Sequence, residues 1–106
     1  MTNKESALYE MNKIVALYDT YLEYVAINGA VLSSNNDEAD IASRYISIVF
    51  RTFMSMKEKK KEILNNEFFN RKKSGWWISK YKKEEYETVL FMAITNFLRR
   101  FTNHAL

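Results

Sequence analysis

The chain has 106 residues, of which 47% are hydrophobic and 15% aromatic, enough for one domain with its own core. It has no Cys, which excludes disulfides, thiolate metal sites and thiol catalysis. It also has no Pro and only two Gly, so the composition favours long helices over a sheet, which would need more turn-forming residues. No apolar run reaches membrane-spanning length and no signal-peptide core follows the N-terminal charges, so we expect a cytoplasmic protein without membrane contact.

Charge is distributed unevenly along the chain, although the net charge is only +3. Residues 1–56 carry four basic and seven acidic side chains, whereas residues 57–106 carry twelve basic and six acidic ones. The basic half suggests a phosphate-binding surface, or else lysine-rich loops that keep a small protein soluble. The charge count alone does not choose between these two interpretations.

Residues 4–32 are predicted to form one long helix, because apolar residues recur there at alternating spacings of three and four. This seam comprises Leu8, Met11, Val15, Tyr18, Leu22, Val25, Gly29 and Leu32. The pattern is typical of a core helix that spans the whole domain, and it also favours pairing of two copies. We keep both interpretations; in the second, a homodimer interface is formed by Leu8, Met11, Val15, Tyr18, Leu22 and Val25.

A polar loop that begins at Ser33 leads into a second predicted helix over 37–54. Its expected buried stripe is Ile41, Tyr45, Ile48, Val49, Thr52 and Phe53. Ser55 and Glu58 have the spacing of a capping box and are expected to open a third helix over 56–69. Met56, Ile63, Leu64 and Phe68 should face inward from this third helix.

The segment 70–75 is interpreted as the connection to a short helix at 76–80, and the last helix should span 83–102. Apolar residues of the last helix form two adjacent stripes, and the second consists of Phe91, Ile94 and Leu98. So wide an apolar arc cannot all face a one-sided core, which makes the second stripe a candidate partner interface. The expected fold is therefore a single all-α domain over 1–106 with four to five helices, in which the long N-terminal helix precedes a bundle at 37–102.

Catalysis has little support in the sequence. His104 is the only His, lies near the C-terminus and is expected to be solvent-exposed. There is no Gly-rich phosphate-binding loop and no cluster of His and acidic residues that would hold a metal. We therefore expect a non-enzymatic protein without a metal or a cofactor.

Basic and aromatic residues are interleaved between Lys57 and Lys83, where ten basic side chains accompany three acidic ones. Clustered Lys and Arg neutralise phosphates, so this stretch is a candidate nucleic-acid interface. Its contact residues are predicted to be Arg71, Lys72, Lys73, Lys80, Lys82 and Lys83. Trp76, Trp77, Tyr81 and Tyr86 are expected to act mainly as a packing hinge between the third and last helices, with at least one Trp buried against the second and last helices.

The aromatic and small residues from 62 to 98 resemble the C-terminal helix–turn–helix of ArpU-type regulators of phages and low-GC Gram-positive bacteria, which look like region 4 of sigma-70 factors. The residues that carry this resemblance are Ile63, Leu64, Phe68, Trp76, Trp77, Tyr81, Tyr86, Ala93, Phe97 and Leu98. The resemblance covers 41–101. It implies a C-terminal helix–turn–helix-like unit and a DNA-binding transcriptional regulator, with the helix from Lys83 in the major groove of duplex DNA and with RNA polymerase or another protein as a further partner.

The chain departs from that family where the recognition helix begins and at its middle. Lys82, Glu84 and Glu85 replace small hydroxylated residues, and residues 90–92 (Leu-Phe-Met) replace basic ones. Base edges are read by polar and basic side chains, so these departures favour an alternative function. In that alternative the chain is a helical interaction or dimerisation module that has lost DNA binding. The two functions can coexist, because helix–turn–helix proteins commonly bind as dimers.

Overall fold

The structure, a computed structural model, describes residues 3–27 and 37–105. Within these ranges it contains four α-helices and no strand: α1 (Lys4–Ile27), α2 (Asp37–Met54), α3 (Glu58–Leu64) and α4 (Lys83–Ala105). A π-helical turn, η2 (Asn65–Phe69), continues α3. The predicted all-α fold with a long N-terminal helix is confirmed. The predicted helix end at 28–32, including Gly29 and Leu32, lies outside the described residues.

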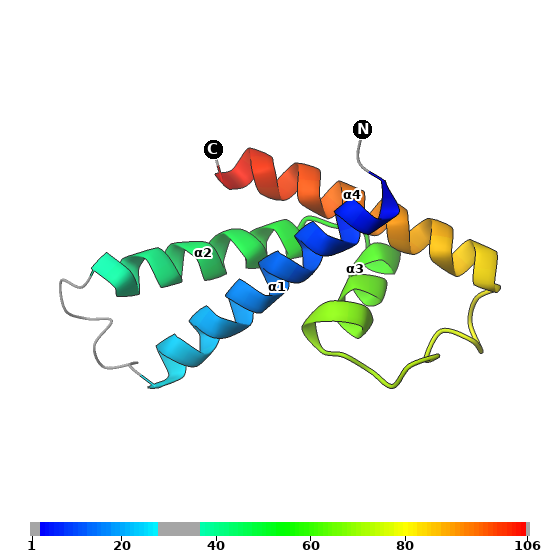
Figure 1. The fold of residues 1–106 in the computed structure, drawn as a ribbon, viewed down its shortest axis with the longest axis horizontal. Coiled ribbons are helices and arrows are strands. Elements are labelled where there is room, and N and C mark those ends of the chain that lie inside the picture. The colour runs from blue at the N-terminus through cyan, green and yellow to red at the C-terminus, as the bar shows by residue number, and fades with distance from the viewer. Residues whose placement is uncertain (1–2, 28–36, 106) are drawn as a thin grey trace.

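Three helices pack around α4, which contacts α1, α2 and α3. Figure 1 shows α1 and α2 side by side, with α4 passing across α1 and with α3 close to the crossing. Residues 70–82, which we call the connector, run around one end of the molecule from η2 to the start of α4 (Figure 1). None of the helices in the described ranges is both long and apolar enough to cross a membrane.

The core lies where the first half of α1 meets α4. On α1 the buried residues Ala7, Met11 and Ile14 recur at helical spacing, and on α4 Ala93 and Phe97 do the same. Met11 and Phe97 are completely buried. Full burial of a side chain of this size stabilises the fold by about 1.5–3 kcal/mol. The seam predicted on the first helix is therefore used inside one chain over its first half.

This packing corrects part of the predicted partner interface. Met11, Val15 and Ile94 have at most 3% of their surface exposed and belong to the core of a single chain, so they cannot contact a second copy without opening it. The other members of the predicted interface keep some exposed surface. They are the exposed Leu8 and Leu22 and the half-buried Tyr18, Val25, Phe91 and Leu98.

The inward face of α2 is shorter than predicted. Val49 and Thr52 are buried, as expected, whereas Ile41 is 55% exposed, which contradicts its assignment to the buried stripe. Ile41 lies near the start of α2, where it lines a shallow hollow with Thr20, Tyr21 and Tyr24 of α1. That part of α2 is therefore covered from one side only.

The capping box predicted for the third helix is absent. Lys57 is the N-cap of α3 and makes no side-chain capping bond, so the helix begins two residues later than expected. The Ser55 hydroxyl instead donates to the Thr52 carbonyl oxygen at 2.7 Å and so helps to end α2. Met56, Ile63, Leu64 and Phe68 are nevertheless buried, as predicted.

The short helix predicted at 76–80 is also wrong, because this segment forms a series of turns. Backbone hydrogen bonds join Trp76 to Lys73, Ile78 to Gly75 and Lys80 to Trp77, each spanning three residues. Gly75 has φ 81°, which is outside the right-handed helical region. Helices α3 and α4 are therefore joined by turns where a helix–turn–helix unit would place a short helix.

Candidate nucleic-acid interface

The connector is fastened to η2 and α4 by a cluster around Glu67. Its carboxylate oxygen Oε1 accepts a hydrogen bond from Trp76 Nε1 at 2.9 Å and another from the Tyr86 hydroxyl. Trp77 stacks on Tyr86, with ring centroids 4.4 Å apart and planes 9° apart. The aromatic residues thus form the predicted packing hinge. Both Trp side chains are only half-buried, however, and they pack on Tyr86 and η2, so the expectation of a Trp buried against α2 was wrong.

Tyr86 is neutral in this cluster. Its burial, together with its hydrogen bond to Glu67 and the negative charge of Glu67, raises the pKa of the Tyr86 hydroxyl above its ordinary value of 10.0. The hydroxyl therefore stays a donor over the whole physiological pH range. This keeps α4 joined to η2, and it fixes both ends of the connector.

All three acidic residues between Lys57 and Lys83 have partners within the chain. Glu58 pairs with Lys61 at 2.7 Å, and Glu62 pairs with Lys80 at 3.1 Å. The Tyr81 hydroxyl also donates to Glu62, and Glu67 accepts from Trp76 and Tyr86 as described above. These acids therefore do not neutralise the other basic side chains of the stretch.

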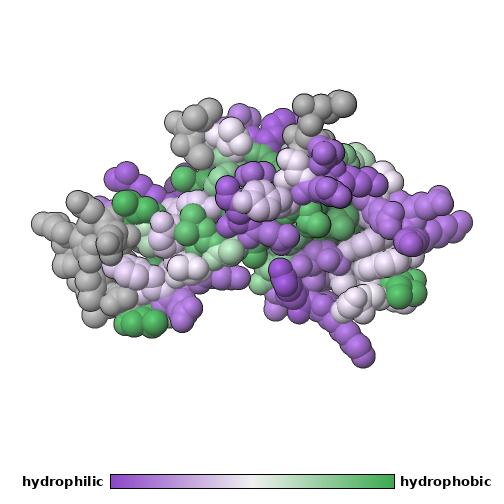
Figure 2. Space-filling model, in the orientation of Figure 1, coloured by the Kyte–Doolittle hydropathy of each residue, from purple (hydrophilic) through white to green (hydrophobic). Residues whose placement is uncertain are grey.

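Of the six predicted contact residues, five are exposed and have no ion pair with any residue that the structure describes. They are Arg71, Lys72 and Lys73 at the start of the connector, Lys82 at its end and Lys83 at the start of α4. The sixth, Lys80, is held by Glu62. Lys59, which was not predicted, lies 5.1 Å from the Tyr81 ring centroid and so brings α3 beside the end of the connector. Figure 2 shows hydrophilic side chains over this end of the molecule.

The start of α4 does not match a base-reading helix. Its exposed residues include Glu84, Glu85, Glu87, Thr88 and Met92, so carboxylates dominate its first turns. The opposite side of the helix, with Tyr86, Ala93, Ile94 and Phe97, is committed to the core. Leu90 and Phe91 are half-buried and line a hollow beside Leu8 of α1, so packing accounts for them.

A groove that the sequence did not suggest lies beside two of the unpaired cations, Arg71 and Lys72. We call it the connector groove; it has a volume of about 450 Å³ and is lined by residues of α1, η2, the connector and α4. Its lining comprises Leu8, Asn12, Asn66, Glu67, Phe68, Arg71, Lys72, Ser74, Gly75, Trp77, Tyr86 and Leu90. The one sequence signal for it is Asn66, a polar residue within an inward-facing apolar stripe, which is only 4% exposed.

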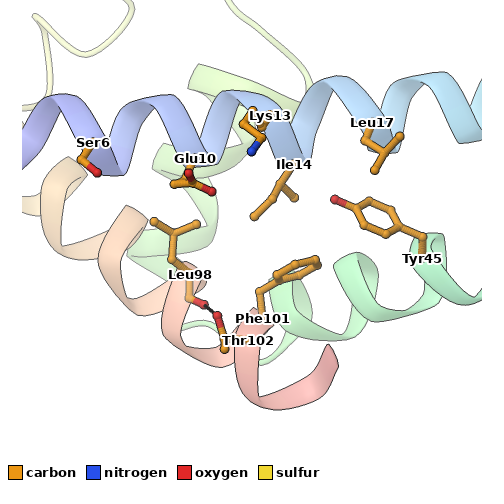
Figure 3. A pocket seen from close by; sticks show the side chains of 9 residues that line it. All are labelled: Ser6, Glu10, Lys13, Ile14, Leu17, Tyr45, Leu98, Phe101 and Thr102. Carbon is orange, nitrogen blue, oxygen red and sulfur yellow. Dashed lines mark hydrogen bonds between the residues drawn. The ribbon is translucent and has the colours of Figure 1, made fainter. Parts of the chain in front are cut away.

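A second hollow, of about 440 Å³, is formed by α1, α2 and α4. Figure 3 shows Ile14, Tyr45, Leu98 and Phe101 facing one another across it, with the oppositely charged Glu10 and Lys13 on α1. The one cation among the described residues that line this hollow is Lys13, which lies 5.5 Å from the Tyr9 ring centroid. His104 lies elsewhere, with Nδ1 3.0 Å from the Thr52 hydroxyl oxygen, so the exposed residue predicted from the sequence also ties α4 to α2.

Comparisons of the chain with protein-family models, with curated proteins and with solved structures gave no match. The arrangement of the side chains themselves therefore carries the functional argument.

Proposed function

We propose that the chain is a non-catalytic DNA-binding protein that contacts the phosphates of duplex DNA through Arg71, Lys72, Lys73, Lys82 and Lys83. One observation carries the proposal: these exposed cations have no ion pair within the described ranges, and the three acids between Lys57 and Lys83 are engaged by other residues of the chain. Clustered unpaired cations release condensed counterions from DNA when they bind its phosphates, and this release drives association. The aromatic cluster supports the proposal, because it holds the backbone that carries these cations in place.

The residues exposed at the start of α4 are compatible with binding through phosphates elsewhere on the chain, and not with reading of bases by this helix. Carboxylates of Glu84, Glu85 and Glu87 are exposed at its start and would repel phosphates on either side of a major groove. The connector therefore contacts the DNA backbone, with little discrimination between sequences. A role in transcription regulation, with RNA polymerase or another protein as partner, rests on the resemblance of residues 41–101 and is part of the proposal on that ground.

A mobility-shift experiment with duplex DNA at low salt tests this function. The unchanged protein should retard the duplex, and the double variant Lys72→Glu with Lys73→Glu should retard it much less. The matched control is Lys4→Glu with Lys13→Glu, which changes the net charge equally at exposed positions of α1. Absence of retardation by the unchanged protein, or equal loss in both double variants, contradicts the proposal.

A second candidate function, homodimerisation, is favoured by an apolar hollow between α1 and α4. Leu8, Leu90 and Phe91 line it together with Lys4 and Glu87, and its volume is about 310 Å³. Leu8 is 43% exposed there, although it belongs to the predicted seam. The opposite charges of Lys4 and Glu87 would suit a symmetric contact between two copies, in which each charge meets the other.

A further inference from the structure

From the connector groove we infer a binding site for one unpaired nucleotide, in which the base stacks on Trp77 and the phosphate lies against Arg71 and Lys72. This inference rests on the proposed function, since it uses two of the same cations. It adds a ligand that a fully paired duplex does not present. Two features of the groove support it: an aromatic ring in its lining and a pair of cations without an ion pair in the described ranges. Polar side chains beside them can bond to the edge of a base.

Trp77 supplies the stacking surface. Tyr86 covers one face of its ring in a parallel stack, and the side chain is nevertheless only half-buried. The exposed part of the ring therefore lies outside this stack, and Trp77 lines the groove. Any nucleobase can stack on an aromatic ring, which is how many proteins hold single strands without sequence preference.

Asn66 and Glu67 supply hydrogen-bonding groups for the edge of a base. Asn66 lines the groove, and its side-chain oxygen accepts from Asn65 Nδ2 at 3.3 Å, so its amide group is held beside the groove. Glu67 uses Oε1 for Trp76 and Tyr86, which leaves Oε2 as an acceptor. Every base presents both donors and acceptors on its edges.

Arg71 and Lys72 supply the positive charge. Both line the groove, both are exposed, and neither has an ion pair with a residue that the structure describes. Guanidinium and ammonium groups beside an aromatic platform are the usual combination in single-strand sites. The groove volume of about 450 Å³ falls in the range of pockets that take small ligands. A base that is paired inside a duplex could not enter it without leaving the stack.

Trp77 fluorescence reports directly on the inferred stack. In a Trp76→Phe background, Trp77 is the only Trp of the chain, and circular dichroism would establish that this variant is folded. The variant is titrated with a single-stranded dodecanucleotide, with its duplex and with the mononucleotides AMP and CMP. The single strand should quench Trp77, with a dissociation constant at least tenfold lower than that of the duplex measured by the same quenching.

Two exposed positions on α1 give a matched pair of variants. Asn12→Glu places a carboxylate in the connector groove, whereas Ser6→Glu places one in the hollow of Figure 3. In the Trp76→Phe background, Asn12→Glu should weaken single-strand quenching at least fivefold and Ser6→Glu should change it less than twofold. Equal effects of the two variants would overturn the assignment to the groove.

The remaining outcomes distinguish a free nucleotide from an unpaired nucleotide within a strand. They also test the groove and the proposed function separately. Quenching by AMP or CMP as well as by the strand supports a site that a free nucleotide can fill, and quenching by the strand alone supports an unpaired nucleotide within a strand. Equal quenching by duplex and strand, or no quenching at millimolar ligand by the folded variant, overturns the inference. The mobility shift of duplex DNA by the unchanged protein and by the Lys72→Glu, Lys73→Glu variant judges the proposed function independently.

Discussion

Glu67 and Tyr86, nineteen residues apart, are joined by a hydrogen bond that the tyrosine hydroxyl donates to the carboxylate. Tyr86 is 5% exposed and lies in the first turn of α4, and Glu67 lies in the π-helical turn η2. Since Trp76 donates to the same carboxylate oxygen, a single acceptor holds η2, the connector and α4 together.

Removal of that acceptor should therefore be costly. Glu67→Ala leaves the buried Tyr86 hydroxyl and the Trp76 indole N–H without their partner, and we expect the free energy of unfolding to fall by about 2–3 kcal/mol. Glu67→Gln keeps an amide oxygen and should lose only about half as much. Urea denaturation measures both values. Glu58→Ala is the control, because it breaks an exposed ion pair and should change stability much less; equal losses at the two positions would contradict this account.

Stability should depend on pH at the alkaline end through Tyr86. The pKa of its hydroxyl is raised in the folded state by burial and by Glu67, so above the ordinary value of 10.0 the unfolded chain loses this proton first. The free energy of unfolding is therefore unaffected by this group below about pH 10 and falls above it, by at most about 1.4 kcal/mol per pH unit for one proton.

Thermal unfolding between pH 8 and pH 11 tests this dependence. Tyr18, Tyr45 and Tyr81 also have a raised pKa, mainly through burial, and contribute in the same direction. Tyr86→Phe should therefore flatten the alkaline decline without abolishing it. An unchanged decline in that variant would show that Tyr86 is not the main source.

Gly75 is a position where the backbone itself sets the residue type. Its φ of 81° is strained for a residue with a Cβ, and a Cβ there would lie 3.0 Å from Ile78 Cδ1. Gly75→Ala should lower the free energy of unfolding by about 1–2 kcal/mol, mostly because of φ, since Ile78 is exposed and can move. Gly75→Asn should cost less, because Asn tolerates this region better. A double variant with Ile78→Ala should recover little; full recovery would assign the cost to the contact instead.

The two parts of the α1 seam should behave differently. Met11→Ala removes a fully buried side chain and should cost about 2–5 kcal/mol, measured by urea denaturation. Leu8→Asp and Leu22→Asp change exposed side chains and should leave the fold intact. If the homodimer forms through the α1–α4 hollow, light scattering should show an assembly that Leu8→Asp dissociates and Leu22→Asp does not. A protein that scatters as a monomer at high concentration would remove the second candidate function.

Helical periodicity predicted α2 and the start of α4 correctly. It failed at 76–80, where contacts with residues distant in sequence determine the backbone conformation. The bounds of α2 and the start of α4 were predicted correctly, because their apolar stripes repeat at helical spacing. The segment 76–80 also has helix-compatible residues. However, Gly75 has a positive φ, and both Trp side chains pack on Tyr86. Neither effect is visible in a local pattern.

The basic residues of the candidate site could be predicted from the sequence, whereas the groove beside them could not. The exposed Arg71, Lys72 and Lys73 follow from composition alone, whereas the engagement of Lys80 by Glu62 depends on a contact between residues eighteen apart. The π-helical turn contains a hydrogen bond from the Asn70 N–H to the Asn65 carbonyl oxygen. No pattern of residues in the sequence predicts this bond. That turn helps to place Asn66 and Glu67 in the groove, so the groove was not predicted.

The salt dependence of duplex DNA binding tests the central claim most directly. Fluorescence anisotropy of a labelled duplex gives the association constant at several salt concentrations. If all five unpaired cations contact phosphates, the logarithm of that constant should fall against the logarithm of salt with a slope of about −4.5. Lys72→Glu with Lys73→Glu should make the slope shallower by about 2, and Lys4→Glu with Lys13→Glu should leave it unchanged. No binding at low salt, or the same slope in the Lys72→Glu, Lys73→Glu variant as in the unchanged protein, would contradict the account.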